Sequence, residues 1–301
     1  MRARNTARAS ANRIHDDAVA REYGYRGGLV PGVTVWAYLS HPIVETWGRA
    51  WLERGSMSAR FLHPLYDGEE AIVEASDGSY GRGDVAGGTG AGGDRAGGEG
   101  AAGGEGAAGG TGAAGAGGRM TISVRDSRGE LCAAAEAGLD EAGSRTAPPP
   151  DAEALLARYP EAALPAEPAQ ATSEVLAGLA VLGTHSVTFD AEQALPYLEA
   201  IGESLALYDE QRLAHPGWLL QQANTTLTRN VRLGPWIHAG SSVQNLAALE
   251  DGSRLGVRGR PTSVYERKGH RLVDLDLLYV ADGRLPVMQV EHTAIWEPRK
   301  S

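Results

Sequence analysis

A cluster of polar side chains near the start of the chain has the composition of a proton-transfer site. The stretch "SANRIHDD" brings Asn12, His15, Asp16 and Asp17 close together in the sequence. Histidine titrates nearest to neutral pH, and an amide or carboxylate beside it can orient the ring or a water molecule. The next apolar segment, "GVTVWAYLSH", begins at Gly32 and is predicted to form a helix. The sequence therefore predicts a polar cluster just ahead of a helix N-terminus.

The overall composition is typical of a soluble globular protein. Of the 301 residues 42% are apolar, and no window approaches the apolar length that a membrane-spanning helix needs. The net charge of -10 disfavours non-specific binding to nucleic acid. Cys132 is the single cysteine, which excludes an internal disulfide and a cysteine-cluster metal site. We expect a cytoplasmic protein whose partners include neither nucleic acid nor a membrane.

Positive charge is concentrated beside the polar cluster. Residues 1–26 carry three acids, and their six arginines are Arg2, Arg4, Arg8, Arg13, Arg21 and Arg26. A basic rim of this kind indicates an anionic ligand, and a solvated arginine face explains the same pattern equally well. Both interpretations stay open at this point.

Two segments of biased composition divide the chain. Residues 81–118 hold 19 of the 41 glycines, which predicts a flexible low-complexity loop whose removal should leave the fold intact. Residues 142–173 are rich in proline and alanine and are predicted to be a connector with one short helix. These segments separate a first half, residues 1–141, from a second half, residues 174–301.

Each half is predicted to place one long helix against one curved antiparallel sheet. In the first half the helix begins at Gly32 and should end near Pro42, and strands lie on both sides of the glycine loop. In the second half a helix begins in "HPGWLLQQANTTL" and four strand-rich stretches follow, with apolar and acidic residues alternating over 273–277. The sequence thus predicts the α+β class, with an internal duplication.

The polar cluster and its surroundings resemble a known family. "NRIHDDAVAREYGYRGGLVPG" is similar to the hydratase motif of the MaoC-like hot-dog proteins, which runs D-x-N-P-x-H-x-D, a short helix, and G-[FY]-x-x-P-[IL]-x-H-G. The strands that begin at "WIHAGSSVQNLAAL" resemble the corresponding sheet of that family. The resemblance covers nearly the whole chain outside the glycine loop and the connector. It implies a double hot-dog fold.

The resemblance also implies catalytic residues. His15 matches the motif's histidine and Asn12 its asparagine, which orients the catalytic loop and a water molecule. Asp17 matches the trailing acid, normally a helix cap. Since free amides at a helix N-terminus can hold the oxyanion of a thioester carbonyl, the backbone N–H of Gly32 is the candidate donor. His15 and the Gly32 amide are therefore expected to face a common cavity.

One departure from the motif concerns the chemistry directly. Ser10 stands where the family has its catalytic Asp, and Arg13 stands where it has Pro. A serine hydroxyl can orient water, but it is no general base near neutral pH. Either Asp16 or Asp17 supplies the acid–base group, or the activity is slower or different, or the pocket only binds.

An acyl tunnel is expected between the two halves, with the first half carrying the chemistry. His215-Pro216-Gly217 matches only the helix-opening end of the motif. The predicted substrate-binding residues are Ser10, Tyr25, Val30, Pro31, His215 and Gly217. Six other histidines are predicted to be satisfied structural side chains: His41, His63, His185, His238, His270 and His292.

The resemblance implies reversible hydration of a 2-enoyl-CoA to an (R)-3-hydroxyacyl-CoA. The substrate would be a thioester of coenzyme A or of an acyl carrier, with no metal and no further cofactor, and a homodimer is left open. A rival hypothesis, supported by Ser10, is a non-catalytic protein that binds acyl thioesters. A thioesterase of the same fold is the third.

Overall fold

The computed structural model describes residues 1–8, 10–78, 118–140 and 151–300. The first half contains the 3-10 turn η1 (Arg13–His15), helices α1 (Asp17–Glu22) and α2 (Gly32–Arg54), and strands β1 (Ser56–Phe61), β2 (Ala71–Asp77), β3 (Gly118–Asp126) and β4 (Leu131–Leu139). The glycine loop, apart from Gly118, lies outside the described residues, as does the start of the connector.

The remaining elements belong to the connector and the second half. They are α3 (Ala152–Arg158), β5 (Ala169–Gln170), α4 (Ser173–Gly178), β6 (Leu182–Thr188), α5 (Ala191–Ile201), α6 (Leu207–Glu210), α7 (Pro216–Asn230), β7 (Val231–Arg232), β8 (Ile237–Asn245), β9 (Arg254–Arg267), β10 (His270–Ala281) and β11 (Leu285–Glu297). The α+β class is therefore confirmed.

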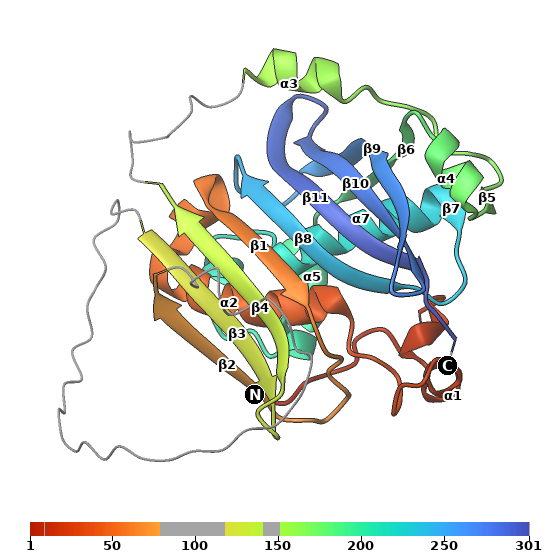
Figure 1. Cartoon of the computed structure of the whole chain (residues 1–301). Helices are drawn as coiled ribbons and strands as arrows, with labels where there is room; N and C mark the ends of the chain where they lie inside the picture. The colour runs from red at the N-terminus through yellow and green to blue at the C-terminus, as the bar shows by residue number, and fades with distance from the viewer. Residues whose placement is uncertain (9, 79–117, 141–150, 301) are drawn as a thin grey trace.

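The two predicted sheets are joined into one. Nine antiparallel strands follow the order β2-β3-β4-β1-β8-β11-β10-β9-β6, so the halves meet where β1 pairs with β8. At this seam Met57 lies opposite Val243 and Ala59 lies opposite Ser241. Figure 1 shows the continuous sheet curving over the long helices. Because β1 and β8 pair with each other, neither is an edge strand, and two sheet edges that would otherwise be exposed are removed.

The sheet wraps around α2 and α7, which lie against each other on its inner face. Helix α2 contacts β1, β3, β4 and β8, while α7 contacts β6 and β9. The helices approach closely at Gly217 of α7, where an added Cβ atom would lie only 3.0 Å from Cβ of Ala37 on α2. Trp36, Trp51 and Leu220 are almost completely buried in the core that results. Burial of these large apolar side chains is the main stabilising term.

Helix α2 is longer than predicted, because Pro42 lies inside it and does not end it. Proline removes one helical hydrogen bond, but the residues beyond it, including Ile43, Val44 and Trp51, are buried against the sheet. Their burial outweighs the lost bond and carries the helix on to Arg54. The break in the helix comes later, at Gly48, whose combination of φ 54° and ψ -145° favours glycine.

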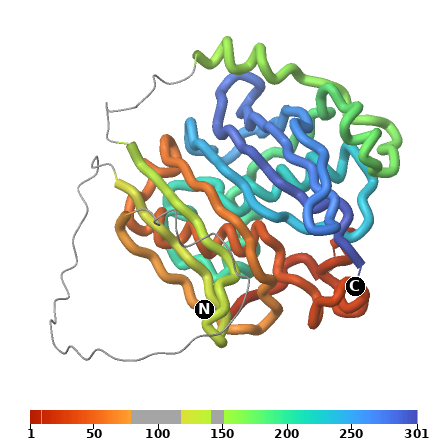
Figure 2. Tube along the Cα trace, viewed as in Figure 1, coloured from red at the N-terminus to blue at the C-terminus, as the bar shows by residue number. Residues whose placement is uncertain are grey.

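The N-terminal segment and the C-terminus meet across the two halves. Ile14, Ala20 and Leu29 form a small buried cluster against which Ile237 of β8 is packed. The ammonium group of Lys300 lies 5.9 Å from the ring centre of Tyr23. Figure 2 shows the C-terminal end of the trace beside the segment that holds α1. The polar cluster of the first half is therefore placed against the strands of the second half. No helix among the described residues is long and apolar enough to cross a membrane.

Candidate functional site

The side chain of Asn12 fixes the polar cluster to the second half. Its Oδ1 accepts hydrogen bonds from the amides of Ile14 (3.3 Å) and Trp236 (3.2 Å). It therefore caps η1 and links the first half to the second. Its Nδ2 donates to the carbonyl of Trp236 at 2.9 Å. Asparagine suits this position because its amide offers both an acceptor and two donors. The second Nδ2 proton faces Nε2 of His15 at 3.3 Å.

His15 is held as a neutral imidazole with its lone pair on Nε2. Its Nδ1 lies 2.7 Å from the carbonyl oxygen of Leu29, and since a carbonyl only accepts, Nδ1 carries the proton. Nε2 is then the unprotonated nitrogen, directed toward Asn12. Burial lowers the pKa of His15, and the hydrogen bond to Leu29 opposes this only in part. The ring can therefore accept a proton at Nε2.

The two aspartates of the cluster have structural partners. Asp16 caps α1 by accepting from the amides of Ala18 (3.0 Å) and Val19 (3.1 Å), as expected of one of the pair. Asp17, the residue that the motif assigned to this role, instead accepts from the Gly28 amide at 2.7 Å and holds the glycine turn. Both carboxylates thus accept hydrogen bonds from backbone amides, and neither lies beside Nε2 of His15.

The glycine turn brings the chain back to His15. Any side chain at Gly28 would collide with the carbonyl group of His15, which also accepts a hydrogen bond from Asn5 Nδ2 at 2.8 Å. After the turn the Leu29 amide reaches the carbonyl of Ile14, and the Val30 amide reaches that of Leu65. The loop is therefore tied to both the polar cluster and the β1–β2 connection.

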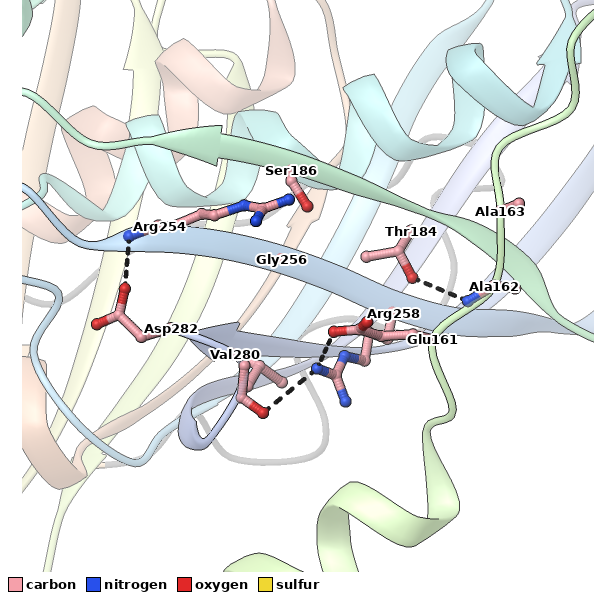
Figure 3. Close-up of a pocket in the computed structure, with 11 residues that line it drawn as sticks. Glu161, Ala162, Ala163, Thr184, Ser186, Arg254, Gly256, Arg258, Val280 and Asp282 are labelled. Carbon is pink, nitrogen blue, oxygen red and sulfur yellow. Dashed lines mark hydrogen bonds and ion pairs between the residues drawn. The ribbon is translucent and has the colours of Figure 1, made fainter.

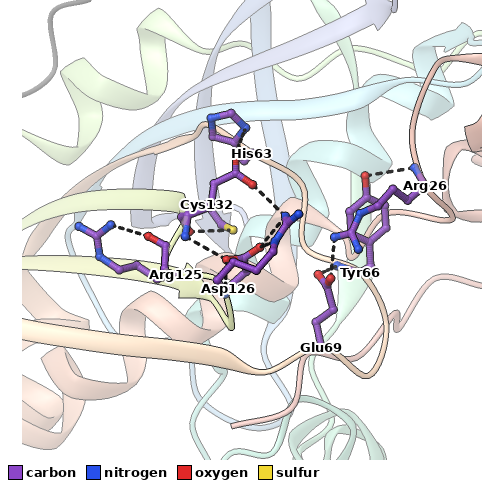
Figure 4. A network of polar contacts seen from close by, with 10 residues as sticks. Arg26, His63, Tyr66, Glu69, Arg125, Asp126 and Cys132 are labelled. Carbon is purple, nitrogen blue, oxygen red and sulfur yellow. Dashed lines mark hydrogen bonds and ion pairs between the residues drawn. The ribbon is translucent and has the colours of Figure 1, made fainter. Parts of the chain in front are cut away.

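Arg26 anchors the outside of this turn. Its guanidinium forms an ion pair with Glu69 at 2.6 Å and lies 4.2 Å from the ring centre of Tyr66, while its amide donates to the Tyr66 hydroxyl. Figure 4 shows these contacts beside a second network around Asp126. Arg8 and Arg13 are also paired, with Asp67 and Asp16. Much of the basic charge near the cluster is thus already neutralised.

The N-terminus of α2 presents free backbone donors. Pro31 supplies no side-chain cap, and its carbonyl already accepts from the amides of Thr34 and Val35. No acceptor among the described residues binds the amides of Gly32 and Val33, as is usual in a first helical turn. A Cβ atom at Gly32 would lie 2.8 Å from Nδ1 of His238. Glycine is required here because the imidazole faces the helix so closely.

Two cavities meet at His15. The smaller, about 210 Å³, is mainly apolar, and its lining includes His15, Tyr25, Val30, Gly32 and His238. The larger is an open groove of about 1010 Å³ between the halves, lined by both polar and apolar side chains. Its lining includes Ser10, Asn12, His15, Pro31, Tyr197, Gln221, Asn224, Thr225, Thr228 and Arg232. Among the described residues, neither lining includes an Asp or a Glu.

The predicted site residues therefore divide into those at the cavities and those elsewhere. Asn12, His15 and Gly32 come together, Tyr25 and Val30 line the small cavity, and Ser10 and Pro31 line the groove. Asp17, His215 and Gly217 line neither. The expected single tunnel with walls from Tyr25, Val30 and the start of α7 is replaced by these two cavities.

The N-terminus of α7 is closed by the protein itself. The Gly217 amide donates to Nδ1 of His215 at 3.0 Å, and a side chain at Gly217 would collide with the hydroxyl of Tyr197. Nε2 of His215 donates to buried Glu203 at 3.2 Å, and His41 binds the same carboxylate. Burial alone would raise the pKa of Glu203, but the bonds from both histidines hold it well below its usual value. This cluster is structural.

The sequence analysis missed a histidine of the small cavity. His238 and His292 were expected to be satisfied structural side chains, but Nδ1 of His238 and Nε2 of His292 have no hydrogen-bond partner among the described residues. Between the two rings, Ser241 Oγ contacts His238 Nε2 at 2.8 Å and His292 Nδ1 at 3.0 Å. The available signal was a histidine in each of two predicted strands, at positions 238 and 292.

Other clusters offer no comparable chemistry. Among the described residues no group of three or more His, Cys, Asp or Glu side chains is placed to hold a metal ion. A separate cleft lies near the β6 edge of the sheet, where Figure 3 shows Arg254 and Arg258. Asp282 accepts from the backbone amide of Arg254, and Glu161 pairs with the Arg258 guanidinium. Of the charged groups in this cleft, the Arg258 guanidinium is thus paired with Glu161, and the Asp282 carboxylate is bound to a backbone amide.

Similar solved structures identify the fold. A MaoC-like dehydratase shares 12% identity at a TM-score of 0.58, over 98% of this chain and 91% of its own. A conserved hypothetical protein from Mycobacterium tuberculosis, described as a double hotdog, shares 15% identity at a TM-score of 0.57, over 97% of this chain and 90% of its own. A candidate MaoC domain protein dehydratase from Chloroflexus aurantiacus shares 10% identity at a TM-score of 0.57, over 98% and 90%.

This protein therefore has the double hot-dog fold, as expected. No protein-family model and no curated protein matches the chain. At these low identities the similarity shows a shared fold. The reaction depends on the residues of this chain's own site.

Proposed function

We propose that the protein hydrates a 2-enoyl-CoA reversibly to a (R)-3-hydroxyacyl-CoA. The observation that carries the proposal is the neutral His15, whose unprotonated Nε2 lies at the junction of two cavities, one of which includes the open N-terminus of α2. A base and a donor of hydrogen bonds to an oxyanion are the two groups that this addition needs. MaoC-like dehydratases among the similar structures support the same assignment.

In the proposed reaction His15 acts first as a base and then as an acid. Nε2 takes a proton from a water molecule that replaces Nδ2 of Asn12 as its hydrogen-bond partner, while the water oxygen bonds to C3 of the enoyl group. The π electrons shift toward the thioester carbonyl, and the amides of Gly32 and Val33 hold the developing oxyanion. The imidazolium then delivers its proton to C2. One water molecule has been added, and His15 is neutral again.

The two cavities suit the two ends of such a substrate. The small cavity is lined mainly by apolar side chains such as Val30, Val35 and Leu65, so it fits the acyl group. The groove offers amide and hydroxyl groups, including Gln221, Asn224 and Thr228, which match the amides and hydroxyl of a pantetheine arm. Since the apolar cavity holds only about 210 Å³, the acyl group should be short.

The experiment is hydration of crotonyl-CoA, followed as loss of its conjugated absorbance. Wild type should hydrate it, and His15→Ala should lose at least a hundredfold in kcat/KM, since a positioned acid–base group contributes roughly 10²–10⁴-fold. His41→Ala is the control, because His41 lines neither cavity. If wild type and His15→Ala are equally inactive on enoyl-CoA esters of every length, the proposal fails.

A second candidate is a protein that binds acyl thioesters without converting them. The specific observation in its favour is that the described lining of both cavities contains no carboxylate, so the acid of the family motif has no replacement there. This candidate requires saturable binding of butyryl-CoA together with absence of crotonyl-CoA hydration. Release of free thiol from butyryl-CoA would indicate a thioesterase instead.

A further inference from the structure

His238 is a buried polar group without a partner for one of its nitrogens. It lies on β8 with 4% of its surface exposed, in a T-shaped contact with the Phe61 ring and stacked on the His292 ring. Nε2 is bound to Ser241, whereas Nδ1 has no hydrogen-bond partner among the described residues. Buried polar atoms are nearly always bonded, so an exception indicates either strain or a role toward a ligand.

The unpartnered nitrogen points at the first turn of α2. Nδ1 lies 2.8 Å from the position that a Cβ of Gly32 would occupy, and both residues line the small cavity together with His15. The imidazole nitrogen and the free helix amides thus face the same space, yet Nδ1 makes no hydrogen bond with them. An imidazole N–H and a backbone N–H that both point at one acceptor atom of a ligand would be arranged in this way.

The Ser241 hydroxyl can hold His238 in the required tautomer. It lies between His238 Nε2 and His292 Nδ1, and with one proton it must donate to one ring and accept from the other. If His292 donates to Ser241 and Ser241 donates to His238 Nε2, the proton of His238 is on Nδ1. Burial and the neighbouring His292 keep the pKa of His238 well below its ordinary value, so the ring stays neutral. A neutral imidazole can act as a hydrogen-bond donor of this kind.

We infer that Nδ1–H of His238 and the amides that open α2 together bind the thioester carbonyl oxygen of the ligand. The site takes an acyl thioester whose carbonyl lies between β8 and α2, with the acyl group in the apolar cavity. Ser241 and His292 are positioning residues that set the tautomer. The inference rests on the proposed function for its ligand class, but it concerns binding of a carbonyl and does not require turnover.

The test compares butyryl-CoA with S-butyl-CoA, a thioether that lacks only the carbonyl oxygen. Wild type should bind butyryl-CoA about tenfold more tightly, as one net hydrogen bond allows. The carbonyl stretch of ¹³C-labelled butyryl-CoA should shift to lower frequency on binding, because both donors polarise the bond. His238→Phe, which keeps a ring but has no donor, should lose most of the preference and of the shift.

Further variants separate a binding role from a structural one. His238→Asn can place an amide N–H near the original Nδ1 and should restore part of the carbonyl shift. Ser241→Ala removes the hydroxyl that fixes the tautomer of His238. It should weaken the carbonyl shift while leaving affinity for S-butyl-CoA unchanged. If His238→Phe does not fold, by circular dichroism and melting temperature, these two variants provide the same readout.

The outcomes also separate this inference from hydration. If folded His238 variants keep the preference for butyryl-CoA and the carbonyl shift, the inference is wrong, whether or not wild type hydrates crotonyl-CoA. The same holds if wild type shows neither preference nor shift. If both depend on His238 but no enoyl-CoA is hydrated, the carbonyl site stands and the proposed function fails.

Discussion

At the scale of single residues, the site depends on which nitrogen of each histidine carries a proton. The Leu29 carbonyl fixes the proton of His15 on Nδ1 and leaves Nε2 as an acceptor. His238 has the complementary arrangement in our inference, with Nδ1 as a donor. One imidazole can then move a proton while the other stabilises charge on oxygen. This division of roles requires that both rings be neutral near pH 7, and burial lowers the pKa of each.

The lowered pKa of His15 makes a prediction for the pH dependence of hydration. The neutral ring is the active form, so kcat/KM should be lost as the pH falls through the pKa of the folded protein. Because that pKa lies below the ordinary 6.5, the rate should be flat from about pH 8 to about pH 6.5 and decline only at lower pH. A pH profile of crotonyl-CoA hydration measures this. An inflection above pH 6.5 would contradict the assignment of His15 as the base.

A substitution at Ser10 tests how much the missing carboxylate lowers the hydration rate. Its side chain lines the groove, and among the described residues its hydroxyl bonds only to the carbonyl of Asn12, at 3.3 Å. Ser10→Asp would place a carboxylate at the motif position and should raise the hydration rate by about tenfold or more. Ser10→Asn is the matched control, since it has the same shape without a base. Equal rates for both variants would show that the position does not reach the reacting atoms.

At the scale of elements, the start of α2 is the feature on which the site depends. Helix α2 enters under the sheet at Pro31-Gly32, where β8 crosses it and His238 faces its first turn. A helix end buried among side chains is costly unless its amides find partners. The absence of a side chain at Gly32 leaves the space in which a ligand oxygen can provide them.

Gly32→Ala should therefore abolish activity without unfolding the protein. The added methyl group would lie 2.8 Å from His238 Nδ1 and 3.0 Å from its Cβ, which forces the imidazole away and covers the amides. We expect a loss on the order of 10²–10³ in kcat, as when an oxyanion donor is removed. Gly178→Ala in α4 is the control, since nothing lies within 4 Å of its new methyl group. A fully active Gly32→Ala enzyme would exclude this helix N-terminus as the oxyanion site.

The sequence predicted those parts of the site that lie close together in the chain. Asn12, His15 and Gly32 belong to one motif, and the short helix and glycine turn between them are local structure. His238 could not be predicted in the same way, because its contact with Gly32 exists only after β8 has paired with β1 and crossed α2. Asp17 was assigned by its motif position, yet the turn geometry gave the cap to Asp16.

The same limit applies to the elements. Alternating patterns predicted the strands well, including the paired strands β3 and β4, which are local hairpin partners. The end of α2 was predicted wrongly at Pro42, because a local rule about proline competes with burial against a sheet that is distant in sequence. The joining of both halves into one nine-stranded sheet is likewise a long-range pairing that no local pattern encodes.

At the scale of the whole molecule, buried neutral histidines couple stability to pH. Burial lowers the pKa of six of the eight histidines relative to the ordinary 6.5: His15, His185, His215, His238, His270 and His292. The unfolded chain then binds more protons than the folded one below about pH 6.5. Their contribution to stability is therefore complete above pH 6.5 and is lost progressively as the pH falls. For His292 the loss continues to about pH 3.

Urea unfolding of wild type and His292→Gln at several pH values tests this coupling. Between about pH 6.5 and pH 5 the unfolding free energy of wild type should fall more steeply, by up to about 1.4 kcal/mol per pH unit, because one titrating group is missing from the variant. Carboxylates titrate mostly below this range and are common to both proteins. Parallel curves would mean that His292 is not kept neutral by the fold.

The closed N-terminus of α7 sets how many ligands one chain can take. Both halves have a helix with a glycine in its first turn, but the Gly217 amide is bound by Nδ1 of His215 and the Tyr197 hydroxyl packs against Gly217, whereas the Gly32 amide has no acceptor among the described residues. In the second half the protein's own side chains thus fill the helix N-terminus. The duplicated fold therefore has a single site that can bind a ligand. Titration calorimetry with butyryl-CoA should therefore saturate at one equivalent per chain, and a stoichiometry of two would show that Tyr197 gives way to ligand.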